Sequence, residues 1–226
     1  MHYVMSDLHG RYDKYQKMLE TIGFCDGDTM YILGDFVDRG PDGIRILQDV
    51  MKRPNVEAVI GNHDWTMMRL IADYPVLVEK MGKEQVLGLF RLWFSDGGLP
   101  TYRQIKNLSE RDRHELLYYV SFMHYYVDVT VNSRRFFMAH TVPEYDADKP
   151  LTEHPAEDFI HGEPDYDVEY DSGTYIVTGH TPTDLIDPKC KGRIWQGNGH
   201  IAIDCGAGFG GPLGCLRLED MAEFYV

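Results

Sequence analysis

The sequence MYILGDFVDRG, residues 30–40, decides the fold. Its first four residues are apolar, which predicts the end of a buried strand. Two carboxylates and a guanidinium follow at Asp35, Asp38 and Arg39. In an open α/β sheet, ligands bind in the crevice beyond the carboxyl ends of the strands. The segment therefore predicts an α/β fold with a functional site at a strand end.

The same order of strand, polar loop and helix occurs three times in the first third of the chain. Three such units argue for parallel β-α-β crossovers, which place their polar loops on one edge of a sheet. The expected strands cover residues 2–5, 29–33 and 57–60, the helices begin near Tyr12, Pro41 and Trp65, and the loops are 6–10, 34–40 and 61–64.

The second half of the chain changes from helical spacing to a period of two, which is typical of strands. Helices expected at residues 86–94 and 109–120 form a helical cap at about residues 83–121. We therefore predict a single domain over residues 1–226, with two mixed β-sheets packed as a sandwich flanked by helices. The remaining strands are expected at 125–131, 135–139 and 175–178, and at 193–195, 201–204, 215–218 and 223–226 in a second sheet.

Composition limits the class of protein. A hydrophobic fraction of 43% is ample for a core in a chain of 226 residues. The net charge of −14 opposes binding to nucleic-acid polymers or anionic membranes. Four cysteines without a C-x-x-C spacing indicate reduced thiols in a cytoplasmic protein. We expect neither a signal peptide nor a membrane span.

One segment departs from the average composition. Residues 144–171 contain eleven Asp or Glu, one Lys and no Arg. The segment has little periodicity, so we expect an exposed acidic loop.

Oxygen and nitrogen ligands follow five of the expected strands. Carboxylate, imidazole and amide groups together suit borderline divalent ions such as manganese, iron or zinc. Each motif alone is also an ordinary turn or helix cap, but the ordered set favours a site. The set is too large for one ion, and an aspartate that bridges two ions accommodates it. Its members are Asp7, His9, Asp35, Asn62, His63, His140 and His180.

Three motifs carry a resemblance to a known family. The segments SDLHG at 6–10, GDFVDRG at 34–40 and GNHD at 61–64 resemble the sequential motifs of calcineurin-like metallophosphoesterases. The Asp-Arg-Gly ending is similar to that of the phosphoprotein phosphatase branch. Segments 93–101, 179–182 and 203–208 resemble the small bacterial and phage members.

The resemblance implies a role for each residue. Asp7 and His9 would bind one divalent metal, and Asp35 would bridge to a second, bound by Asn62, His140 and His180. A hydroxide between the metals would attack phosphorus while His63 protonates the leaving oxygen, Asp38 orients His63 and Arg39 holds phosphate oxygens. Asp64 would support the site or cap the following helix. Manganese is the first choice of metal, with iron or zinc as alternatives.

One feature departs from that branch. Its members carry a second phosphate-binding Arg between the two late histidines, and this chain has no Arg between His140 and His180. His161 lies about where that Arg is expected and could replace it, although an exposed loop histidine is the simpler interpretation.

These features predict a phosphoester hydrolase. The main hypothesis is a serine/threonine protein phosphatase, because an acidic rim would repel a polyphosphate more than a phosphopeptide with basic flanks. The first alternative is a symmetrical bis(5'-nucleosyl)-tetraphosphate hydrolase, which would use the same metals. The second is a non-catalytic module that binds a phosphorylated ligand. The expected partner is a phosphoprotein or a phosphorylated small molecule.

Overall fold

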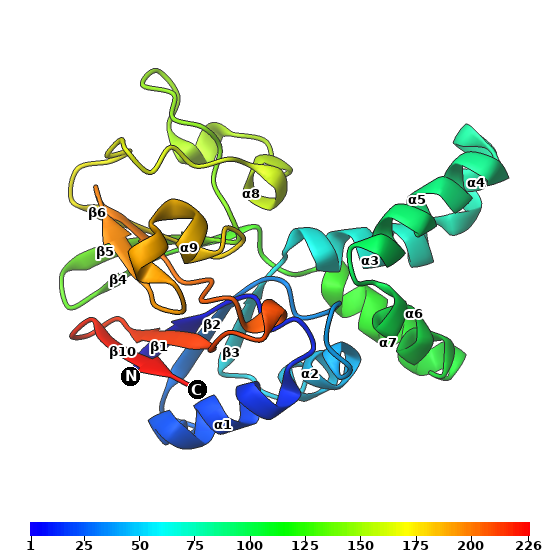
Figure 1. The fold of residues 1–226 in the computed structure, drawn as a ribbon, viewed down its shortest axis with the longest axis horizontal. Coiled ribbons are helices and arrows are strands. Elements are labelled where there is room, and N and C mark those ends of the chain that lie inside the picture. Colours follow the sequence, from blue (N-terminus) through cyan, green and yellow to red (C-terminus); the bar gives the residue numbers. More distant parts are fainter.

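The computed structural model describes residues 1–226 as two five-stranded sheets packed face to face, with helices outside (Figure 1). This confirms the predicted fold class. The first sheet has the order β10-β9-β1-β2-β3 and the second the order β4-β5-β6-β8-β7. The strands of the first sheet are β1 (His2–Met5), β2 (Thr29–Leu33), β3 (Val56–Val59), β9 (Gly214–Arg217) and β10 (Ala222–Tyr225).

The first three strands are parallel, as the repeated units predict. Their side chains alternate between two cores: Tyr3 and Met5 face the helices, whereas Val4 faces the second sheet. The crossover helices bury apolar faces, such as Ile44, Leu47 and Val50 in the second of them. These helices are α1 (Tyr12–Ile22), α2 (Gly43–Val50) and α3 (Asn62–Ala72).

The second sheet contains β4 (Tyr126–Val131), β5 (Arg134–Ala139), β6 (Thr174–Thr178), β7 (Trp195–Gly197) and β8 (His200–Ala202). Phe136 and Met138 point inward and share a core with Val4 and Tyr31 of the first sheet. The prediction that β9 and β10 belong to this sheet was wrong. β9 instead pairs antiparallel with β1, with Tyr3 opposite Arg217, and so supplies hydrogen-bond partners along an edge that would otherwise be free.

Four further helices follow α3 in the chain, three of them packed against α3 and one against α2, and Figure 1 shows them together on one side of the sheets. α5 (Lys83–Ser95) and α7 (Glu110–Ser121) were expected. α4 (Tyr74–Met81) and α6 (Leu99–Lys106) were not. Both begin with a proline in the first turn, where its missing N–H does no harm. None of the helices is long and apolar enough to cross a bilayer.

The acidic segment is only partly an exposed loop. It contains η1 (Leu151–Glu153) and α8 (Asp158–His161), and both Phe159 and Ile160 are buried. Phe159 packs against Tyr126 and Phe137, which anchors α8 to the outer face of the second sheet. The last short helices are α9 (Thr183–Ile186), η2 (Pro188–Cys190) and η3 (Ala207–Phe209).

Candidate active site

All nine predicted site residues follow the carboxyl ends of strands in the two sheets. Five come after β1 and β2 at the loops 6–10 and 34–40, two open α3 after β3, and two follow β5 and β6. Six of them are buried and three are half-buried. The buried residues are Asp7, His9, Asp35, Asp38, His63 and His140, and the half-buried ones are Arg39, Asn62 and His180.

The backbone of this edge is strained. Six of the nine residues have a positive φ, a conformation that few non-glycine residues adopt. Such strain persists only where surrounding structure imposes it, and it concentrates at functional sites. The six are Asp7, His9, Asp35, Asp38, Arg39 and His180, with φ between 41° and 70°.

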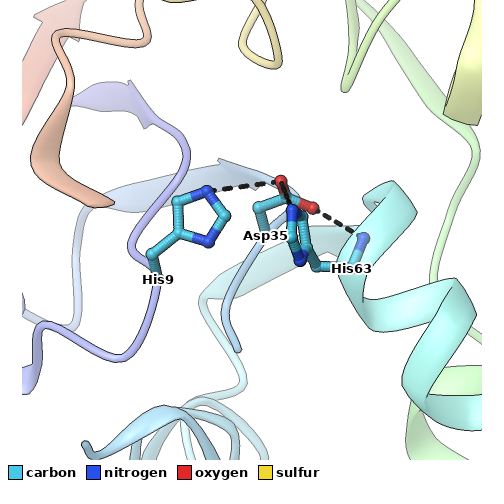
Figure 2. Close-up of side chains that lie close together, drawn as sticks. All are labelled: His9, Asp35 and His63. Carbon is cyan, nitrogen blue, oxygen red and sulfur yellow. Dashed lines mark hydrogen bonds and ion pairs between the residues drawn. The ribbon is translucent and has the colours of Figure 1, made fainter. Parts of the chain in front are cut away.

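Asp35 lies at the centre. Figure 2 shows the rings of His9 and His63 both directed at its carboxylate. Its Oδ2 is 3.5 Å from His9 Nε2 and 3.9 Å from His63 Nε2, and its Oδ1 is 3.6 Å from His140 Nε2. Asp35 belongs to two groups that could each hold a metal ion, one with His9 and His63 and one with Asp7 and His140. A carboxylate shared by two groups is the arrangement that a bridging ligand requires.

Asn62, His140 and His180 bring three possible ligand atoms close together. His140 Nδ1 lies 2.8 Å from the Leu33 carbonyl oxygen, so it carries the proton and Nε2 presents a lone pair. That nitrogen is 2.9 Å from Asn62 Oδ1 and 3.1 Å from His180 Nδ1, which are themselves 3.1 Å apart. Adjacent ligands of an ion with bonds of about 2.1 Å lie about 3 Å apart when at right angles. The three atoms therefore fit a divalent cation.

The protonation states suit metal binding. Burial lowers the pKa of His9 to about 3 and that of His180 to about 4, so both imidazoles are neutral near pH 7, the form that ligates metals. His9 Nδ1 donates to the Val37 carbonyl oxygen at 3.0 Å, which leaves the lone pair on Nε2.

The two buried carboxylates Asp7 and Asp35 differ in their electrostatic surroundings. Burial, Asp204 and Asp35 raise the pKa of Asp7 well above its usual range. Burial opposes the ionisation of Asp35, yet the surrounding histidines hold its pKa below the usual range. A cation would compensate both carboxylates.

His63 is held by Asp38. His63 Nδ1 lies 2.7 Å from Asp38 Oδ2, which also accepts the Trp93 indole N–H at 2.8 Å. The Asp38 backbone N–H donates to Thr101 Oγ1 at 2.9 Å. Burial lowers the pKa of His63, but the charges of Asp35 and Asp38 outweigh it and raise the pKa to about 9. The imidazole is thus oriented with Nε2 toward Asp35.

Arg39 lies across the mouth of the site. Its Nη1 is 2.6 Å from His9 Nε2 and its Nη2 is 3.1 Å from His63 Nε2. The exposed ring of Phe209 lies 4.3 Å from the guanidinium carbon. The Arg39 backbone N–H donates to the Gly97 carbonyl oxygen at 2.9 Å. Gly97 has φ 97°, and a Cβ there would meet Arg39 Cγ, so only glycine fits this approach.

Three further residues were not predicted to act in the site. Trp93 and Thr101 hold Asp38, although the sequence resemblance covered residues 93–101 without giving either residue a role. Asp204 is buried, and burial raises its pKa to about 7. It lies in the segment 203–208, which was also noted only as a motif.

Asp64 supports the site and caps α3. Its Oδ2 accepts the N–H groups of Asp35 at 2.8 Å and Gly61 at 3.1 Å, and its Oδ1 accepts that of Phe36 at 3.1 Å. It therefore ties the metal-binding turn to the start of the helix. His161 is exposed on α8 and lines a groove together with Asn62 and His63.

The family model and the relatives found by comparison with known proteins agree with each other. The family model described as calcineurin-like phosphoesterase matches residues 3–184 of this chain. The symmetrical bis(5'-nucleosyl)-tetraphosphatase of Wigglesworthia glossinidia brevipalpis is 34% identical over 88 residues, 38% of this chain and 32% of that protein. The enzyme of the same name from Neisseria gonorrhoeae (strain NCCP11945) is 42% identical over 65 residues, 28% of this chain and 24% of that protein. The matches thus span about a third or less of these relatives.

Solved structures share the fold. A crystal structure of a "putative diadenosine tetraphosphatase" has a TM-score of 0.67 at 17% identity, covering 100% of this chain and 92% of that one. A protein serine/threonine phosphatase from Saccharomyces cerevisiae has a TM-score of 0.61 at 13% identity, covering 100% of this chain and 78% of that one. At these sequence identities the similarity shows the shared fold alone.

Proposed function

The chain belongs to the calcineurin-like phosphoesterase family, and from that premise we propose that it is a metal-dependent hydrolase of symmetrical dinucleoside tetraphosphates. The observation that carries the proposal is the position of Asp35. It belongs to both candidate metal-binding groups, and it lies beside His63, which is paired with Asp38. The names of the relatives supply the substrate class.

Each site residue has a role in this proposal. Two divalent ions, manganese first and iron or zinc as alternatives, would be held by Asp7 and His9 and by Asn62, His140 and His180, with Asp35 between them. When bound, such ions polarise the phosphate and activate water as the nucleophile. His63, oriented by Asp38, donates a proton to the leaving oxygen as the P–O bond of the anhydride breaks. Arg39 binds phosphate oxygens through its planar guanidinium.

The substrate differs from our main sequence-based hypothesis, which was a phosphoserine or phosphothreonine protein. That hypothesis depended on an acidic rim at the site. Of the eleven acidic residues in 144–171, only Glu157 lines the groove beside His63. Four others surround a separate cavity over β5; they are Glu144, Asp146, Asp148 and Asp171. The charge argument against a polyphosphate is therefore weak.

We also propose that residues 1–226 act as one domain and that the helices at about 83–121 are a cap beside the site. Trp93, Gly97 and Thr101 support this, because they contact Asp38 and Arg39 directly. A cytoplasmic location is proposed because all four cysteines are free, as expected in a reducing compartment.

The test compares three substrates with purified protein and Mn²⁺. Diadenosine tetraphosphate should yield two ADP, measured by chromatography, with kcat/KM at least tenfold above that for a panel of phosphoserine peptides. p-Nitrophenyl phosphate serves as the substrate that reports on chemistry alone. A preference for the peptides would refute the proposed substrate. Two ions bound per chain without turnover of any substrate would instead indicate a binding module.

A further inference from the structure

A groove of about 560 Å³ opens directly beside His63. It runs between α3 and the α4–α5 pair and reaches α8. Its volume lies within the range of about 300–1,000 Å³ typical of small-molecule sites. One end contains Asn62 and His63. Most of the remaining wall is formed by side chains to which the proposed mechanism gives no part, with the exception of Trp93, which holds Asp38.

The position of His63 indicates which part of a substrate enters the groove. A general acid must lie within hydrogen-bond reach of the leaving oxygen. The leaving group therefore departs on the side of the phosphorus that faces His63. Since His63 also lines the groove, a leaving group longer than a single phosphate extends into it.

The walls of the groove suit a flat aromatic ring. Trp65 is half-buried on α3, and Leu89, Leu92 and Trp93 face it from α5. Leu92 is 67% exposed, so a ligand that covers it removes apolar surface from water. An aromatic pair in offset or edge-to-face contact contributes about 0.5–1.5 kcal/mol beyond the buried area.

The polar groups of the groove favour a base over a phosphate. Asp96 and Glu157 line it and can accept hydrogen bonds from an exocyclic amino group, and Asp96 also lies 3.7 Å from Arg39 Nη2 and from His63 Nε2. Arg69 is paired with Asp73 at 3.0 Å, and its guanidinium carbon lies 5.4 Å from the centre of the Trp65 ring. The groove thus offers an apolar stacking wall and hydrogen-bond acceptors.

We propose that this groove binds the amino-bearing base of the leaving nucleotide and that Trp65 is a specificity residue for it. This inference rests on the proposed function. The alternative occupant, an apolar side chain of a phosphopeptide, is an outcome of the test.

With Mn²⁺ and with a panel of phosphoserine peptides assayed in parallel, the experiment measures kcat/KM for diadenosine tetraphosphate and for p-nitrophenyl phosphate. In Trp65→Ala the ratio of the two values should fall at least tenfold, whereas Trp65→Phe, which keeps an aromatic ring, should retain most of the ratio. Phe122→Ala is the matched control, because Phe122 is an exposed aromatic residue after α7 that does not line the groove. Thermal unfolding checks that Trp65→Ala is folded. If it is not, the fluorescence quenching of Trp65→Phe by ADP decides, and quenching equal to that of the wild type would overturn the inference.

A second measurement detects binding without turnover. ADP should quench the tryptophan fluorescence of the wild-type protein and should quench Trp65→Phe less. An unchanged ratio in Trp65→Ala, with a wild type that cleaves diadenosine tetraphosphate, would overturn the groove assignment and leave the proposed function standing. A fall confined to phosphopeptides would assign the groove to a protein segment and overturn the inference. A wild type that does not cleave the dinucleotide would refute the proposed function itself.

Discussion

Replacing Asp64 by Asn should destabilise the protein strongly, although the side chains have the same shape. The carboxylate accepts three backbone N–H groups, from Asp35, Phe36 and Gly61, at 2.8–3.1 Å. Burial and the charge of Asp35 raise the pKa of Asp64 well above its usual range, and the N–H donors of Gly61 and Asp35 oppose that shift by stabilising the ionised form. A hydrogen bond to a charged group contributes about 1.5–3 kcal/mol and a neutral one about 0.5–1.5 kcal/mol. The amide oxygen keeps two weakened bonds, worth about 1 kcal/mol less each, and the NH₂ group leaves the third donor unpaired.

The loss of these hydrogen bonds is partly offset because the substitution removes a buried charge. The free energy of unfolding should therefore fall by about 3 kcal/mol. For a chain of this size that corresponds to a fall in Tm of about 6–12 °C. Thermal and urea unfolding in EDTA measure it without contributions from metal binding. Asp13→Asn is the control, because Asp13 pairs with Arg11 at the surface and such pairs contribute about 0.2–1 kcal/mol. Equal small shifts in both variants would refute the role given to Asp64.

Three further variants test the catalytic assignments. His63→Asn should lower kcat by about 10²–10⁴-fold, the usual contribution of a general acid, while metal analysis still finds two ions per chain; an unchanged rate would contradict its role. Asp35→Asn should reduce metal content measured by plasma emission spectroscopy, and full occupancy would exclude it as the bridge. Trp93→Phe removes one hydrogen-bond donor to the Asp38 carboxylate, a bond worth about 1.5–3 kcal/mol. We expect kcat to fall about tenfold or more with little change in KM. A change in KM alone would mean that Trp93 only lines the substrate groove.

The sequence predicts the first sheet well because its signals are local. Apolar runs, polar loops and helical spacing alternate within short segments, so β1 to β3 and α1 to α3 are found near their true bounds. The position of β9 is not local: Tyr3 and Arg217 are paired partners far apart in the chain. Apolar alternation suits any half-buried strand and does not specify which sheet receives it. The helix α4 was missed because it is short and opens with a proline.

The candidate site likewise contains residues that local motifs predict and contacts that they do not predict. His9, Asp35 and His63 stand in compact motifs, so their presence could be inferred from residue types after strands. The partners of Asp38 could not, because Trp93 and Thr101 reach it from separate helices. Nor does the sequence show that Phe159 would bury part of the acidic segment. Such contacts depend on packing in three dimensions, and no spacing rule encodes them.

The pairing of β1 with β9 has a consequence for the order of folding. The loop after β1, with Asp7 and His9, lies near the start of the chain, while the strand β9 that flanks β1 lies near its end. Loop-closure entropy delays contacts of such high sequence separation. We therefore expect this half of the site to become rigid late, after the helical crossovers have formed. Until β9 pairs with it, β1 has a free strand edge, the kind of edge at which chains associate.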